Sequence, residues 1–85
     1  IYKEQEKRLE EAGLKYIQNK YISENESEIK ITKQELINSN YIEEIYDIND
    51  KTKICNAYVI INNINTIPVA KGYISCDKYE TENYK

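Results

Sequence analysis

The chain has 85 residues, 40% of them hydrophobic, and a formal net charge of −3 at pH 7. This length suits a single small domain, and we expect residues 1–85 to form one. Acidic and basic residues are interspersed, which argues against nucleic-acid binding, and no run of about 20 apolar residues could cross a membrane. We therefore expect neither a nucleic-acid partner nor a membrane-spanning segment within this stretch.

The sequence also argues against an enzyme. The chain has no histidine, which removes the commonest general base and every histidine-based catalytic triad. Its two glycines lie too far apart for a phosphate-binding loop. The clustered carboxylates do not form a glycosidase-like pair, because adjacent positions point apart on a helix or strand: Glu10 with Glu11, and Glu43 with Glu44. We expect no catalytic residue, no cofactor and no metal.

Residues 1–22 are predicted to form an N-terminal helix. Strong helix formers dominate this segment and no proline interrupts it. Its apolar and small residues recur at spacings of three, four and seven, which is typical of one buried helical face: Tyr2, Leu9, Ala12, Gly13, Tyr16, Ile17 and Tyr21. The small pair Ala12 and Gly13 would let another backbone approach closely. No capping residue precedes Ile1, so we expect the helix to be part of a longer one.

A short second helix is predicted over residues 32–39. The motif TKQE at its start matches a capping box, in which the Thr32 hydroxyl bonds the Glu35 amide and the Glu35 side chain reaches back. Leu36 and the isoleucine after it would be buried. Asn40 stands where a left-handed residue ends a helix, and asparagine is the usual choice there after glycine.

Polar stretches connect these elements. Residues 23–28 end the first helix, and residues 28–31 alternate in a way that indicates a short extended piece. Residues 41–46 are predicted to be extended or irregular, residues 47–52 to form a turn, and residues 78–85 to form a polar tail.

A calcium loop is an alternative for residues 47–52. Asp47 and Asn49 fit the first two ligand positions of an EF-hand loop, whereas Lys51 and Thr52 do not fit the next two. We therefore favour a solvated turn.

Residues 53–77 contain both cysteines, the longest apolar runs and the only proline, and they predict a β-hairpin. Opposed positions of an antiparallel pair have a constant sum, so a bond between the two cysteines would fix the register. In that register one face is small or apolar in both strands: Cys55, Ala57, Val59 and Ile61 against Cys76, Ile74, Gly72 and Ala70. The other face is mostly polar, with Tyr58 opposite Tyr73 as an aromatic pair. A one-residue slip would mix the two faces.

This agreement between register and polarity favours a disulfide between Cys55 and Cys76 over two buried free thiols, which remain the alternative. The bond would close a loop of about 22 residues and stabilise the fold by roughly 3 kcal/mol. Two cysteines without histidine argue against a zinc site, which usually needs four ligands. We place the hairpin loop at residues 62–67, with Pro68 opening the return strand.

The order of these elements resembles that of a known family. A helix, a loop, a short capped helix and an antiparallel sheet with a late disulfide resemble the globular part of a type IV pilin or pseudopilin from a Gram-positive bacterium. Residues 2–17, YKEQEKRLEEAGLKYI, resemble the lower half of the pilin spine helix. Residues 31–42, ITKQELINSNYI, resemble the family's short helix and turn, with Asn40 in place of the usual glycine. Residues 55–62 and 72–81 resemble its cysteine-bearing C-terminal strands.

The resemblance implies an α+β fold, in which an N-terminal helix packs on a small antiparallel sheet with a short second helix. It also implies a structural subunit of an extracellular filament at the cell surface, without turnover. The precursor would be anchored in the membrane by an apolar half-helix that this sequence lacks. Through that segment the protein would assemble with other pilin subunits.

Two alternatives to a filament subunit stay open. One is a minor pilin or surface adhesin that acts as a binding module, and the other is an unrelated small secreted domain with a disulfide. We expect the given stretch to be part of a longer protein, because it begins at Ile1 and lacks the family's processed N-terminus.

Overall fold

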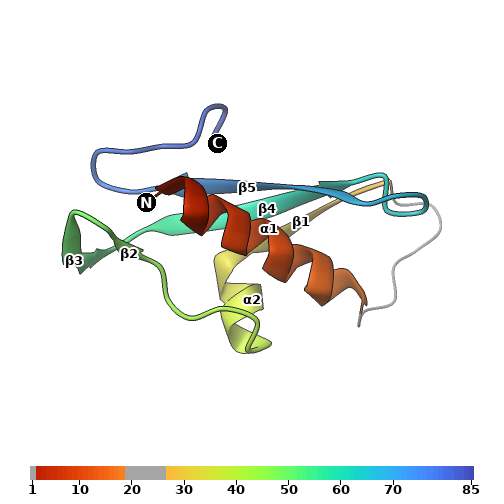
Figure 1. Ribbon diagram of the computed structural model, residues 1–85, viewed down its shortest axis with the longest axis horizontal. Coiled ribbons are helices and arrows are strands. Elements are labelled where there is room, and N and C mark those ends of the chain that lie inside the picture. The colour runs from red at the N-terminus through yellow and green to blue at the C-terminus, as the bar shows by residue number, and fades with distance from the viewer. Residues whose placement is uncertain (1, 19–26) are drawn as a thin grey trace.

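The computed structural model describes residues 2–18 and 27–85. The helices in these ranges are α1 (Tyr2–Gln18) and α2 (Lys33–Asn38). The strands are β1 (Glu28–Thr32), β2 (Tyr46–Asp47), β3 (Asp50–Ile54), β4 (Asn56–Asn62) and β5 (Val69–Ser75). Figure 1 shows α1 lying across the larger sheet. The predicted α+β arrangement, an N-terminal helix on a small antiparallel sheet with a short second helix, is confirmed.

Strands β1, β4 and β5 form an antiparallel sheet with β4 in the centre. The register of β4 and β5 is the predicted one, with Ala57 opposite Ile74 and Val59 opposite Gly72. Val59 and Ile74 are fully buried, because this face of the sheet lies under α1. The loop between the strands covers residues 63–68, one residue later than predicted.

The buried face of α1 follows the predicted stripe. Leu9, Ala12 and Tyr16 belong to the core that the helix shares with the sheet. Tyr2, at the start of the stripe, is only partly buried. Residues 19–22, which were also predicted to be helical, lie outside the described residues.

The backbone of α1 approaches the sheet closely at Gly72 on β5. A Cβ atom there would lie 2.6 Å from the backbone oxygen of Glu6, so only glycine fits without a shift of the helix. Gly13, one of the small pair predicted to allow this approach, faces a side chain instead: its Cβ would lie 2.9 Å from Cγ1 of Val59. Gly13 thus allows close packing on β4 as predicted, but its neighbours are side chains, and the close approach of two backbones is found at Gly72.

Helix α2 has both predicted end signals. The Glu35 amide donates to the Thr32 hydroxyl at 3.2 Å, and the Thr32 amide donates to the Glu35 carboxylate at 3.0 Å, which completes the capping box. Asn40 has φ 64°, and the Tyr41 amide donates to the Leu36 carbonyl at 3.0 Å. This is the Schellman arrangement that ends a helix. The helix stops one residue earlier than predicted.

Strands β2 and β3 form a second, two-stranded sheet that the sequence did not predict. Tyr46 pairs with Ile54, and the turn between the strands is residues 48–49, shorter than the predicted 47–52. Strand β3 is almost entirely exposed. Because its sequence DKTKI lacks an apolar residue at every second position, composition indicated only a turn there.

Residues 78–85 were predicted to be a polar tail, but they fold back on the sheet (Figure 1). Glu80 forms a β-bridge with the end of β5, and Thr81 is 5% exposed. The ring of Tyr84 packs on Tyr58, with 5.2 Å between ring centroids. This contact helps to bury Tyr58 to 7% exposure, although it lies on the face predicted to be polar.

Candidate functional site

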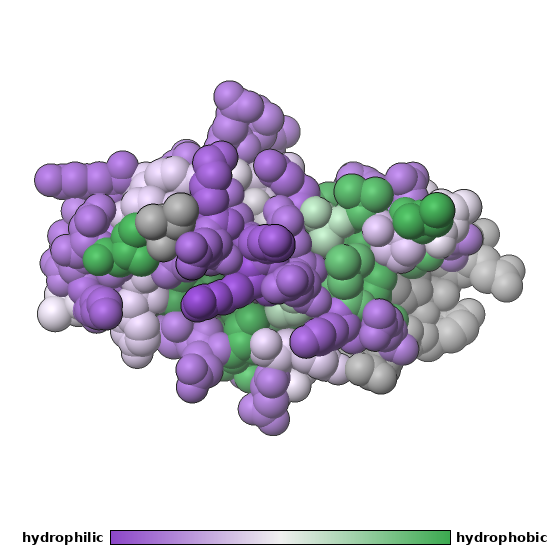
Figure 2. Space-filling model, viewed as in Figure 1, coloured by the Kyte–Doolittle hydropathy of each residue, from purple (hydrophilic) through white to green (hydrophobic). Residues whose placement is uncertain are grey.

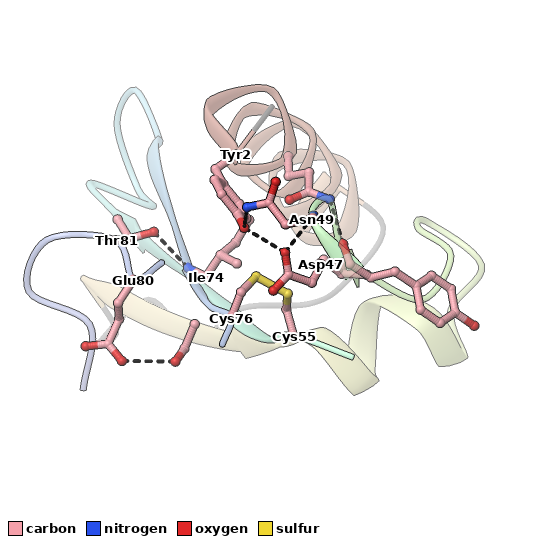
Figure 3. Close-up of a disulfide and its surroundings, with 12 residues drawn as sticks. Tyr2, Asp47, Asn49, Cys55, Ile74, Cys76, Glu80 and Thr81 are labelled. Carbon is pink, nitrogen blue, oxygen red and sulfur yellow. Dashed lines mark hydrogen bonds between the residues drawn. A yellow bond between two sulfur atoms is a disulfide. The ribbon is translucent and has the colours of Figure 1, made fainter. Parts of the chain in front are cut away.

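The predicted disulfide is present between Cys55 and Cys76, with an S–S distance of 1.99 Å. It lies where the two hairpins and the C-terminal segment meet (Figure 3). The Cys55 amide donates to the Ile45 carbonyl at 2.9 Å, and the Cys76 amide donates to the Tyr79 carbonyl at 2.7 Å. Cys55 is fully buried and Cys76 is partly exposed. The disulfide therefore closes the predicted hairpin of β4 and β5, and backbone hydrogen bonds of its two cysteines add the segment before β2 and the C-terminal segment to this junction.

Asp47 lies directly beside this disulfide and is 3% exposed. One of its carboxylate oxygens lies within 4.8 Å of both sulfur atoms, and all three donor atoms are mutually within that distance. The carboxylate accepts hydrogen bonds from the Tyr2 hydroxyl at 2.7 Å and from the Asn49 amide at 2.9 Å. These bonds, the Tyr2 bond first, hold the pKa of Asp47 below its ordinary value, although burial acts in the opposite direction.

The interpretation of residues 47–52 as a solvated turn is wrong for its first residue. Asp47 is buried, and Asn49 donates through its side chain to the Tyr2 hydroxyl at 3.1 Å. The two residues weighed as calcium ligands thus take part in one hydrogen-bond network with α1. Sequence reasoning could not place Asp47 beside the cysteines, because the pairing of β2 with β3 was not recognised.

Glu6 is a second buried carboxylate, at 8% exposure, and sequence reasoning missed it. It accepts hydrogen bonds from the Tyr79 and Thr81 hydroxyls, each at 2.5 Å. The bond to Glu6 raises the pKa of Tyr79 above its ordinary value, with burial adding to the effect. The spacing could have indicated its burial, because Glu6 lies three residues before Leu9 and therefore on the buried stripe of α1.

The aromatic rings of Tyr2 and Tyr79 connect the two carboxylate networks. They stack with 4.1 Å between centroids and 1° between planes. The start of α1, the β2–β3 turn and the C-terminal segment are therefore held together by hydroxyl–carboxylate bonds and one ring stack. Each carboxylate accepts from two groups of the chain itself, so this junction acts as a structural clamp.

A groove of about 700 Å³ runs between α1 and the segment that leads into β2. The buried residues Leu9, Ala12 and Ile45 are among its lining, and Arg8 and Lys51 are among its charged residues. Near it, Lys33 and Glu44 form an ion pair at 2.6 Å, which fixes this segment against β1 and α2.

One wall of this groove contains a polar atom without a partner among the described residues, the buried side-chain oxygen of Gln5. The Gln5 side-chain nitrogen donates to the Tyr46 carbonyl at 3.1 Å. The groove thus presents apolar surface and both signs of charge, whereas the Gln5 oxygen is enclosed in its wall.

Exposed apolar side chains gather at two separate places. Tyr46, Ile48 and Ile54 lie on the β2–β3 hairpin, and Ile67 and Val69 lie at the β4–β5 loop, where Ile67 is 81% exposed. Figure 2 shows apolar surface at both ends of this view of the molecule, with charged and polar surface over α1 between them. Large exposed apolar residues are common at protein contacts.

Comparison with protein-family models, with curated proteins and with solved structures gave no match. Within residues 2–18 and 27–85, neither helix is long and apolar enough to span a membrane.

Proposed function

We propose that this chain is the globular part of a type IV pilin or pseudopilin subunit, a structural component of an extracellular filament. The observation that carries the proposal is the arrangement of α1 on the sheet. The helix packs by one stripe against β4 and β5, and its other side remains charged and exposed. A filament subunit needs such a helix, held firmly by its own domain and free on its outer side.

The clamp around the disulfide supports a load-bearing role. The bond between Cys55 and Cys76, the Tyr2–Asp47 bond and the bonds to Glu6 all hold the start of α1 or the sheet beneath it. These contacts join residues far apart in sequence, so a pull on the helix is distributed through the fold. Disulfides persist mainly in oxidising compartments, which supports an extracellular location.

The first test is the gene sequence upstream of Ile1. The proposal expects a short basic leader followed by about 20 apolar residues, enough to anchor a helix in a membrane. A gene without such a segment contradicts the pilin proposal and leaves an unrelated small secreted domain as the better reading.

The second test uses filaments sheared from the surface of the native cell. An antibody to this chain should label them, and Lys7→Glu should lower the filament yield, because Lys7 lies exposed on α1. Glu82→Lys is the matched control, an equally exposed charge reversal in the C-terminal segment. Equal yields from both variants would show that the outer side of α1 makes no contact between subunits.

A binding module, such as a minor tip pilin or adhesin, is the second candidate, and the groove beside α1 favours it. A groove that combines apolar walls with a few polar and charged side chains is typical of a ligand site, and Gln5 is one of its lining residues. Abundance separates the two candidates: a major subunit dominates the sheared material, whereas a tip protein is scarce there. Gln5→Ala would then impair adhesion and leave filament yield unchanged.

A further inference from the structure

The disulfide has a charged neighbour that bears on its chemistry. The Asp47 carboxylate lies within 4.8 Å of both sulfur atoms, in a place where Asp47 is 3% exposed and Cys55 is fully buried. A nearby negative charge and exclusion of water both disfavour a thiolate. Two cations among the described residues lie in this region, and each is paired with a carboxylate of its own. The Lys33 ammonium donates to the Cys55 carbonyl at 2.9 Å and forms an ion pair with Glu44 at 2.6 Å, and the exposed Lys53 is bound to Asp77 at 3.0 Å.

The two cysteine residues differ in exposure. Cys76 is partly exposed, whereas Cys55 is fully buried, so a reductant reaches the sulfur of Cys76 first. Attack there breaks the S–S bond and leaves the electron pair on the sulfur of Cys55. The leaving thiolate therefore forms at the buried position beside Asp47.

We propose that the Asp47 carboxylate protects the Cys55–Cys76 bond from reduction by opposing the formation of the Cys55 thiolate. With a dithiol as reductant, one thiolate of the dithiol bonds to the Cys76 sulfur and the Cys55 thiolate leaves, then takes a proton from water. The second thiol of the reductant attacks the mixed disulfide and releases Cys76. The chain gains two electrons and two protons, and the dithiol is oxidised to its own disulfide.

The surroundings keep the protecting charge in place. The Tyr2 hydroxyl and the Asn49 amide bind the carboxylate, which keeps it ionised and directed at the sulfur atoms (Figure 3). Asp50, the next carboxylate along the chain, is bound instead by the Thr52 amide and hydroxyl. Among the described residues, Asp47 is thus the one whose carboxylate oxygen lies within 4.8 Å of both sulfur atoms. The inference rests on this geometry and not on the proposed filament function.

Reduction kinetics of the folded protein test the proposal. Oxidised protein is mixed with dithiothreitol at neutral pH, and the appearance of free thiols is followed by alkylation and mass spectrometry. We expect Asp47→Asn to be reduced about 10-fold faster than the unchanged chain, because removal of the negative charge lowers the pKa of the leaving thiol and a thiol of lower pKa leaves faster. Equal rates overturn the proposal.

Two control variants separate charge from stability. Asp50→Asn removes a charge from the same hairpin and should stay within about twofold of the unchanged chain. Tyr2→Phe removes one hydrogen bond to Asp47, while the bond from the Asn49 backbone amide remains, so the variant loosens the junction and leaves the charged carboxylate beside the sulfur atoms. If Tyr2→Phe speeds reduction as much as Asp47→Asn, stability explains the effect and the proposal fails.

The dependence on reductant concentration gives a further readout. Direct attack on the folded protein makes the rate of Asp47→Asn rise in proportion to dithiothreitol. A rate that reaches a plateau shows that the variant must first open, which also overturns the proposal.

Discussion

At the residue scale, Gly72 sets how closely α1 lies on the sheet. Its φ is not positive, so the position needs glycine for space and not for backbone conformation. The atom that a new Cβ would meet at 2.6 Å is the backbone oxygen of Glu6, which cannot rotate away. Gly13, by contrast, would meet Cγ1 of the Val59 side chain at 2.9 Å, so a methyl group there displaces a side chain and not the backbone of another element.

These two glycines therefore predict different outcomes for the same substitution. Gly72→Ala should destabilise the fold by about 1–3 kcal/mol, because the helix must lift from the core. Gly13→Ala should be close to neutral, since the strain against Val59 is offset by about 1 kcal/mol of helix propensity. Urea unfolding of both variants measures the difference. Equal losses would show that the helix backbone is not in contact with β5 at Gly72.

The bond between Tyr79 and Glu6 predicts a pH dependence on the alkaline side. The pKa of Tyr79 is raised above its ordinary value of 10.0, chiefly by the hydrogen bond to Glu6. A group whose pKa is higher in the folded state contributes stability below its unfolded pKa, and this is lost as pH rises through the folded value. The free energy of unfolding should thus fall above about pH 10, and Tyr79→Phe should weaken that fall. An identical pH profile for the variant would exclude this bond as its source.

At the element scale, α2 depends on the capping box that begins it. The Thr32 hydroxyl and the Glu35 carboxylate satisfy amides that a short helix otherwise leaves without partners. The single residue of α2 that is fully buried, Leu36, holds the helix against the core. A helix this short is not stable by itself, so it depends on the packing of Leu36 together with its caps.

Removal of this cap gives a measurable loss. Thr32→Ala should lower the free energy of unfolding by about 1 kcal/mol. Thr32→Ser should retain most of this stability, because serine keeps the hydroxyl. Chemical denaturation of both variants provides the measurement. If both variants lose the same free energy of unfolding, the methyl group of Thr32 stabilises the fold and its hydroxyl does not.

The elements differ in how far the sequence could predict them. The β4–β5 register was predictable because alternation sorts small and apolar residues onto one face, and the Tyr58–Tyr73 pair indeed stacks at 4.9 Å. The two ends of α2 were predictable because caps are local. The sequence did not predict β3, and the prediction of a polar tail for the C-terminal segment was wrong, because contacts with residues distant in sequence fix both segments. The Tyr2–Asp47 bond spans 45 positions and the Glu6–Thr81 bond spans 75.

The candidate site was predictable only in part, for the same reason. The disulfide followed from the pairing of two strands that are neighbours in sequence. Asp47 and Glu6 could not be assigned to the site, because their partners come from other elements. A charged residue on a buried helical face, such as Glu6, was the one signal available before the structure.

At the scale of the whole molecule, the disulfide contributes stability that a small core lacks. Closing a loop of about 22 residues raises the free energy of unfolding by roughly 3 kcal/mol. For a chain of this size, that amount corresponds to a melting temperature lower by more than about 10 °C when the bond is absent.

A double variant, Cys55→Ala with Cys76→Ala, tests this contribution. Its melting temperature, measured by circular dichroism, should be more than about 10 °C lower than that of the oxidised chain. The oxidised state of the reference is verified by a mass lighter than the dithiol by two hydrogen atoms. An unchanged melting temperature would contradict a stabilising role for the bond.

The Glu6–Thr81 bond has a consequence for the order of events during synthesis. The ribosome makes Glu6 early, whereas the hydroxyls that bind it belong to Tyr79 and Thr81. Until residue 81 has left the exit tunnel, the nascent chain cannot enclose this carboxylate with its partners. The N-terminal helix therefore docks fully only at a late point of translation, and any earlier compact form leaves Glu6 in contact with water.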